Sequence, residues 1–219
     1  MPAEMIPVPF SSRRLGVLIS GRGSNLQSII LAIGQGRLDA QIAIVVSNRH
    51  DAAGLKRASE AGIEAMCLAP RDFAGRDAYD RALASTLDAR GVDVVCLAGF
   101  MRLVGAPLLA AFPNRMLNIH PSLLPAFPGL DAQRQALDYG VRVTGATVHL
   151  VTSELDGGPI VLQSAVPVLD DDTVETLSSR ILVEEHRIYP EAIRLLLDGE
   201  WSVDGRRFVR GAPGSPRRA

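Results

Sequence analysis

The chain has 219 residues, of which 47% are hydrophobic and 21% are charged, and its formal net charge is −1. This length and composition suit one soluble globular domain with a core of good size. A net charge so close to zero excludes a strong overall field that would draw the protein onto nucleic acid or a membrane surface. We therefore expect neither nucleic acid nor a membrane among its partners.

The cysteines and the amino-terminal residues indicate the cellular setting. Cys67 and Cys96 each lie in an apolar stretch and no CxxC motif occurs, so we expect buried thiols rather than a disulfide or zinc ligands. The first twelve residues contain no long apolar run, which predicts neither a signal peptide nor a membrane span. These features predict a cytoplasmic protein without a metal site.

The first half of the chain alternates apolar runs with segments of helical spacing. The runs at 15–20, 42–47, 63–68 and 92–98 predict buried strands, and the segments at 26–33, 51–61 and 77–90 predict helices. Strands that alternate with helices are typical of a parallel sheet covered on both faces. We therefore predict an α/β fold.

The second half has a different pattern. A strand is predicted at 115–119, an antiparallel pair at 144–151 and 160–168, a long helix at 173–198, and a hairpin at 201–208 around Asp204-Gly205. The sheet should therefore be mixed. We predict a single domain over residues 1–199 and a C-terminal extension over 200–219. Five arginines near the end predict a solvated tail: Arg206, Arg207, Arg210, Arg217 and Arg218.

A glycine-rich turn joins the first predicted strand to the first predicted helix. Gly21 and Gly23 allow a tight turn and a close approach of the backbone to a ligand. The unpaired N–H groups of the first helical turn, with Ser24 and Asn25, suit an anion such as a phosphate. Because Leu26 replaces the third glycine, the turn is not a dinucleotide-binding fingerprint. A plain capped turn between strand and helix is the alternative reading.

Two polar side chains share one face at the end of the strand at 115–119. Asn118 and His120 are two residues apart, so both point the same way. Ligands of open α/β sheets bind beyond the carboxyl ends of the strands, which is where this pair lies. A structural, hydrogen-bonded histidine is the alternative to a catalytic one.

Asp156 lies in a Leu-Asp-Gly-Gly-Pro segment that reads first as a turn. We predict that it folds back onto His120, where a carboxylate would favour the protonated imidazole. Asn118 and His120 can then hold the oxyanion that forms when an amine attacks a formamide-like carbon, at roughly 3–4 kcal/mol per donor. Asp156, directly or through water, can accept the proton that the amine loses. A turn-capping aspartate is the alternative.

Six ordered motifs together resemble the folate-dependent glycinamide ribonucleotide formyltransferase family of purine synthesis. The resemblance runs from about residue 15 to residue 197 and implies a Rossmann-like, mainly parallel sheet of the formyltransferase type. The motifs are VLISGRGSNLQ (17–27), VVSNR (45–49), LAGFMR (97–102), LNIHPSLLPAFPGL (117–130), ELDGGPIVLQ (154–163) and EEHRIYPEAI (184–193).

The resemblance also implies roles for individual residues. The substrates would be glycinamide ribonucleotide and 10-formyltetrahydrofolate, with Asn118, His120 and Asp156 as the catalytic trio. Residues that resemble the family's ribonucleotide site are Gly23, Ser24, Asn25 and Glu185. Residues that resemble its folate site are Arg76, Met101, Arg102, Leu103, Val104, Asn118, Thr152, Leu155 and Asp156. Arg22, where a neutral residue is common, and Leu182, where a polar one is frequent, depart from the family pattern.

Two other formyl-folate enzymes share the Asn-x-His and Asp core. Methionyl-tRNA formyltransferases usually carry an extra tRNA-binding domain, and formyltetrahydrofolate deformylases usually begin with a small regulatory domain. The length of this chain and its Gly-Ser-Asn turn favour the ribonucleotide enzyme. A non-catalytic nucleotide-binding module is a further alternative, for which His120 and Asp156 would be dispensable. We also expect that an enzyme of this size can form a homodimer through a sheet face.

Overall fold

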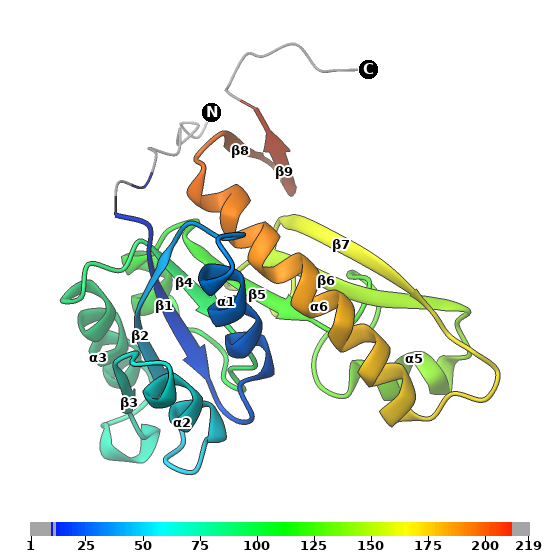
Figure 1. Cartoon of the computed structure of the whole chain (residues 1–219), viewed down its shortest axis with the longest axis horizontal. Helices are drawn as coiled ribbons and strands as arrows, with labels where there is room; N and C mark the ends of the chain where they lie inside the picture. Colours follow the sequence, from blue (N-terminus) through cyan, green and yellow to red (C-terminus); the bar gives the residue numbers. More distant parts are fainter. Residues whose placement is uncertain (1–9, 11, 212–219) are drawn as a thin grey trace.

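A computed structural model describes residue 10 and residues 12–211, and places the strands in one sheet (Figure 1). Across the sheet the strands run in the order β3-β2-β1-β4-β5-β6-β7-β9-β8. Their bounds are β1 (Arg14–Ile19), β2 (Gln41–Ser47), β3 (Ala65–Cys67), β4 (Val94–Leu97), β5 (Met116–His120), β6 (Val143–Leu150), β7 (Ile160–Pro167), β8 (Trp201–Asp204) and β9 (Arg207–Arg210).

The strands β3, β2, β1, β4 and β5 are parallel, whereas β6 pairs antiparallel with β5 and β7 pairs antiparallel with β6. The mixed, mainly parallel sheet and the antiparallel pair are therefore as predicted. β1 and β4 read as nearly unbroken apolar runs because both of their faces are buried. The carboxyl ends of β1, β4 and β5 lie at the same edge of the sheet, so the loops that follow these three strands lie there together.

Helices cover both faces, as predicted. One face packs against α1, α2 and α6, and the opposite face packs against α3 and α4, while α5 contacts α6. The bounds are α1 (Ser24–Gly34), α2 (Ala53–Glu60), α3 (Arg76–Asp88), α4 (Ala106–Ala111), α5 (Ala132–Tyr139) and α6 (Val174–Leu197). The long helix α6 begins with a capping box between Thr173 and Thr176. Among the helices that the structure describes, none combines the length and the apolar character needed to cross a membrane.

The predicted carboxyl-terminal hairpin is present as β8 and β9, and it belongs to the sheet. β9 pairs with β7 through Ile160 and Arg207, so the hairpin extends the edge beyond β7. Trp201 is a member of the main core, donates its indole N–H to the carbonyl of Leu196 and stacks on Phe208. Residues 201–210 are thus packed onto the preceding domain.

The structure adds elements that the sequence pattern did not indicate. The short helices α4 and α5 and a 3-10 turn at Pro70–Asp72 fall in segments for which the sequence pattern predicts neither a helix nor a strand. The hairpin turn consists of Gly205 and Arg206, one residue later than predicted. Most of the first twelve residues and the arginines at 217 and 218, which carried the predictions of no signal peptide and a solvated tail, lie outside the described residues.

Candidate active site

His120 and Asp156 meet although 36 positions separate them in the chain. His120 ends β5, and Asp156 lies in the turn between β6 and β7. His120 Nδ1 lies 3.5 Å from Asp156 Oδ2, and their side chains are only 7% and 8% exposed. The loop that follows β5 contacts both, because His120 Nε2 lies 2.8 Å from the Phe127 carbonyl oxygen and Gly129 N–H donates to Asp156 Oδ2 at 2.8 Å. The predicted approach of the carboxylate to the imidazole is therefore present.

Asn118 contacts a second buried histidine. His149 lies opposite Asn118 in the β5–β6 pairing, and its Nε2 is 3.1 Å from Asn118 Nδ2. His149 Nδ1 lies 2.9 Å from the Leu150 carbonyl oxygen, which can only accept, so Nδ1 carries a hydrogen. A neutral His149 then accepts at Nε2 from the Asn118 amide. The amide has two N–H bonds, and the second one remains for another acceptor.

His149 is the site residue that our sequence reasoning missed. His149 is buried, as a packed structural histidine would be, but its Nε2 also lies 3.6 Å from Asp156 Oδ1. Asp156 is therefore held between two imidazoles. The register of the predicted strands at 115–119 and 144–151 is the signal that could have placed His149 beside Asn118.

The surroundings of Asp156 favour its charged form. Burial alone would raise the pKa of this carboxyl, but the neighbouring His149 ring, the hydrogen bond from Gly129 N–H and the positive charge that His120 and His149 carry when protonated together outweigh it. The pKa of Asp156 consequently lies below its ordinary value, and the group is a carboxylate at neutral pH. Asp156 also has a φ of 51°, in the left-handed region that aspartate tolerates better than most residues.

A cavity of about 230 Å³ opens beside this cluster. It lies between the loop that follows β4 and the loop between β6 and β7. It is lined by Arg76, Leu97, Phe100, Arg102, Leu103, Val104, Asn118, His149, Val151 and 152–156. Every predicted folate residue except Met101 is among them. Met101 is 67% exposed, and its backbone N–H instead donates to Ser20 Oγ at 2.8 Å.

The glycine-rich turn has the geometry of an open helix amino terminus. Gly23 precedes α1 with a φ of 71°, and a Cβ there would lie 2.8 Å from the Cα of Gly54, so only glycine fits. In the described part of the chain, no side chain caps this end of α1. The first-turn N–H groups of Ser24 and Asn25 are therefore suited to an anion.

Asn25 connects this turn to α6. Its Nδ2 donates to Glu185 Oε2 at 2.7 Å, and both residues are buried, at 7% exposure each. The structure thus brings two of the predicted ribonucleotide residues together. One N–H of the Asn25 side-chain amide is thus engaged by Glu185, while the backbone N–H of Asn25 belongs to the first turn of α1.

The family model of the formyl transferases matches residues 13–193 of this chain. The chain belongs to this family.

Relatives within the formyl transferase family cover most of the chain. Phosphoribosylglycinamide formyltransferase of Escherichia coli K12 is 47% identical over 190 residues, which are 87% of each protein. The crystal structure of glycinamide ribonucleotide transformylase 1 from Symbiobacterium toebii is 61% identical, with a TM-score of 0.89 over 91% of this chain and 93% of that one. The trifunctional purine biosynthetic protein adenosine-3 of Bos taurus is 48% identical over 186 residues, but the match spans only 18% of its length.

The two departures from the family pattern lie near the turn and on α6. Arg22 is exposed, and its carbonyl oxygen accepts from Arg57 Nε at 2.9 Å. Leu182 lies on α6 one turn before Glu185 and is half-buried. An apolar side chain at 182 has no hydrogen-bonding group to offer a ligand, so Glu185 is the polar contact that α6 supplies on this face.

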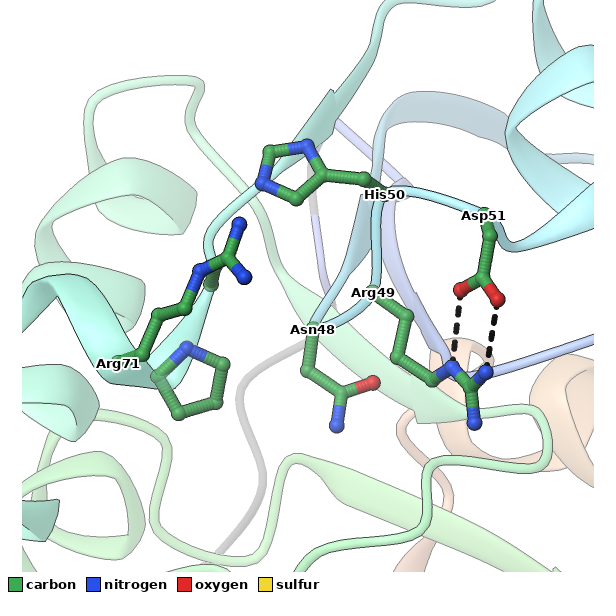
Figure 2. A pocket seen from close by; sticks show the side chains of 7 residues that line it. Asn48, Arg49, His50, Asp51 and Arg71 are labelled. Carbon is green, nitrogen blue, oxygen red and sulfur yellow. Dashed lines mark hydrogen bonds and ion pairs between the residues drawn. The ribbon is translucent and has the colours of Figure 1, made fainter.

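A second cavity, of about 340 Å³, lies where β2 and β3 end. It is lined by Asn48, Arg49, His50, Asp51, Ala69, Pro70 and Arg71, and Figure 2 shows the two hydrogen bonds between Arg49 and Asp51. His50 is exposed in this loop. None of the predicted site residues lines this cavity. Across the described residues, no group of three His, Cys, Asp or Glu side chains gathers as a metal centre requires.

Glu185 should lower the stability of the protein at neutral pH. Burial raises the pKa of this carboxyl, and the hydrogen bond from Asn25 only partly opposes the shift. A carboxyl whose folded pKa is raised contributes stability below its unfolded pKa, and this contribution is lost as the pH rises through the folded pKa. We expect Glu185→Gln, which keeps an acceptor for Asn25, to unfold at higher urea than wild type at pH 8, with the difference shrinking toward pH 5.

Glu184→Gln is the matched control for this urea titration. The pKa of Glu184 is lowered by hydrogen bonds from Ser164 and Arg187, so its replacement should destabilise the protein slightly at pH 8. A lower unfolding midpoint for Glu185→Gln than for wild type at pH 8 would contradict the predicted cost of burying this charge.

Proposed function

We propose that this chain transfers the formyl group of 10-formyltetrahydrofolate to the amine of glycinamide ribonucleotide. The observation that carries the proposal is that Asn118 and Asp156 line the same cavity as the predicted folate residues, with His120 directly beside Asp156. In the reaction the amine nitrogen attacks the formyl carbon, and the tetrahedral intermediate then loses N10 of the folate. One C–N bond forms and one breaks, the amine loses a proton, and N10 gains one.

Asn118 and His120 are the donors to the formyl oxygen in this proposal. Both ring nitrogens of His120 face acceptors, the carbonyl of Phe127 and the carboxylate of Asp156, and only the doubly protonated ring can donate to both. The 3.5 Å separation from Asp156 is longer than a good hydrogen bond, so the Nδ1–H is not fully engaged by the carboxylate, and we assign it as a donor to the developing oxyanion. The free N–H of Asn118 is the second donor.

In this proposal Asp156 acts chiefly by stabilising the positive charge of the doubly protonated His120. The lowered pKa of Asp156 makes it a poor direct acceptor for the amine proton, so of the two predicted routes, direct transfer or transfer through water, we favour the second. A water molecule next to the carboxylate is the better carrier of that proton to N10. The fixed negative charge between His120 and His149 keeps the donors oriented before the substrate arrives.

The ribonucleotide would lie across the glycine-rich turn. The backbone N–H groups of Gly23, Ser24 and Asn25, with the Ser24 hydroxyl, suit the phosphate, and Glu185 suits the glycinamide end. The folate would occupy the cavity between residues 101–104 and 152–156. The two substrates then meet at the carboxyl ends of β1, β4 and β5.

The cellular compartment and the oligomeric state of the enzyme are part of the same proposal. We propose that it works in the cytoplasm, which the free thiols of Cys67 and Cys96 support, and that it forms a homodimer. Sedimentation equilibrium over a hundredfold concentration range would decide the second point, since a single species with the mass of one chain would exclude the dimer.

The function is tested by comparing three acceptors. Purified protein is mixed with 10-formyltetrahydrofolate and either glycinamide ribonucleotide, initiator methionyl-tRNA or water alone, and the folate absorbance is followed. We expect rapid turnover only with the ribonucleotide. Equal turnover with water would identify a deformylase, and turnover with the tRNA would identify a methionyl-tRNA formyltransferase.

Ser24→Ala tests the phosphate site. Loss of one hydrogen bond to a charged group costs about 1.5–3 kcal/mol, so we expect the KM for glycinamide ribonucleotide to rise by roughly 10–100-fold. The KM for the folate should stay within twofold, as should both constants in the exposed control Ser59→Ala. An unchanged ribonucleotide KM in Ser24→Ala would remove the phosphate role.

A further inference from the structure

The loop between β4 and α4 forms one wall of the folate cavity, and α3 holds it at three points. Arg76 Nη2 donates to the Val104 carbonyl at 2.9 Å, and the Arg102 guanidinium lies 5.0 Å from the centre of the Tyr79 ring. The third contact is the shortest, since Gly105 N–H donates to Asp80 Oδ2 at 2.6 Å. The arginine side chains of the first two contacts are exposed or half-buried, and the third contact is buried.

Asp80 is a carboxyl within a largely apolar layer. It is 3% exposed and lies on the face of α3 that also buries Tyr79, Leu83 and Leu87. Burial raises the pKa of this carboxyl, and the Gly105 N–H and the charges of Arg76 and Arg102 only partly oppose the shift. A buried carboxyl is unfavourable unless it is hydrogen-bonded, and Gly105 N–H supplies that bond.

The absence of a side chain at Gly105 allows the Asp80 carboxyl to approach its backbone N–H. Gly105 has a φ of −98° and a ψ of 175°, which any residue can adopt, so its backbone conformation does not require glycine. A Cβ at this position would instead lie 2.4 Å from Asp80 Oδ2 and 3.3 Å from Arg76 Nε. The close approach of the Asp80 carboxyl is thus what excludes a side chain at 105.

We propose that Asp80 is a positioning residue for the folate site and acts through the backbone N–H of Gly105. Asp80 does not line the cavity, whereas Arg102, Leu103 and Val104, directly before Gly105, do. The bond to Asp80 fixes where this wall ends and α4 begins, and so fixes the width of the cavity. This inference rests on the proposed function, because it assigns the cavity to the folate.

The test separates folate binding from ribonucleotide binding. In Asp80→Ala we expect the KM for 10-formyltetrahydrofolate to rise on the order of tenfold, with the KM for the ribonucleotide and kcat within twofold. Asp80→Asn keeps an oxygen acceptor for Gly105 N–H and should restore most of the affinity. Asp77→Asn, an exposed acid on the same helix, is the matched control and should change neither constant. An equal rise in both KM values, or none, would overturn the inference.

A double substitution shows whether Asp80 acts through residue 105. Gly105→Ala alone should raise the folate KM, because its methyl group meets the carboxyl. In Asp80→Ala the methyl group gains room, so the double variant should be no worse than Asp80→Ala alone. Independent, multiplying effects would overturn the inference. If Asp80→Ala does not fold, Asp80→Ser combined with Gly105→Ala provides the same comparison, because the shorter serine side chain also leaves room for the methyl group.

A direct measurement of tetrahydrofolate binding distinguishes a failure of this inference from a failure of the proposed function. Calorimetry of tetrahydrofolate with each folded variant needs no turnover. Wild-type protein that does not bind tetrahydrofolate would refute the proposed function and, with it, the inference. Wild-type protein that binds, with Asp80→Ala and Gly105→Ala binding equally well, would refute the role of Asp80 alone.

Discussion

Replacing His120 with alanine should lower kcat by roughly 10²–10³-fold, because the variant loses one donor to the oxyanion. His120 is 5% exposed and is held between Phe127 and Asp156, so water cannot readily take its place as an oriented donor. The donor acts on charge that develops during the reaction, so the KM for the folate should change by less than threefold. Single-turnover rates at saturating substrates measure the effect without product release.

His50→Ala is the matched control for this experiment. His50 is exposed and lines the second cavity, so its loss should leave kcat within twofold of wild type. Unfolding midpoints of both variants show whether each protein is folded. A folded His120→Ala protein with near wild-type kcat would remove His120 from the mechanism and favour a purely structural histidine.

Asp156→Asn should lower kcat by roughly 10²–10⁴-fold, the range for loss of a group that supports proton transfer. The substitution preserves the shape of the side chain and keeps an oxygen for the Gly129 N–H, but it removes the negative charge between His120 and His149. The imidazole of His120 then no longer faces a carboxylate. The kcat at pH 7.5, measured with saturating substrates, reports the loss.

The same substitution should also change the pH dependence of stability. A carboxyl whose folded pKa is lowered contributes stability above its unfolded pKa, and that contribution is lost as the pH falls through the folded pKa. Asp156→Asn should therefore be less stable than wild type at neutral pH, and the gap should close in acid. A variant with wild-type kcat and wild-type stability at pH 7 would leave Asp156 as a simple turn residue.

Most of the strands could be predicted because a strand that is buried on both faces consists almost entirely of apolar residues. β1, β2 and β4 have apolar residues on both faces, which is characteristic of the middle of a parallel sheet. The short helices α4 and α5 were missed because six and eight residues do not establish a helical period. α4 also has Pro107 in its first turn, which reads equally well as a loop.

The candidate site was predicted only in part, for a related reason. Asn118 and His120 share a face by the two-residue period of a strand, and the motifs around Gly23 and Asp156 are local. No motif within β6 marks His149 as functional. Its role depends on Asn118, which lies opposite it in the pairing of β5 with β6. Asp80 likewise depends on a loop 25 positions away. Such contacts are non-local, so no spacing within one segment reveals them.

Periods and motifs within short segments are enough to predict the alternation of most strands and helices, the shared face of Asn118 and His120, and the family. Three other features depend on the folded chain: the position of Asp156 between two imidazoles, the bond from Asn25 to Glu185, and the pairing of the hairpin after α6 with the sheet. These contacts join residues far apart in the chain, and the packing of the helices against the sheet brings them together.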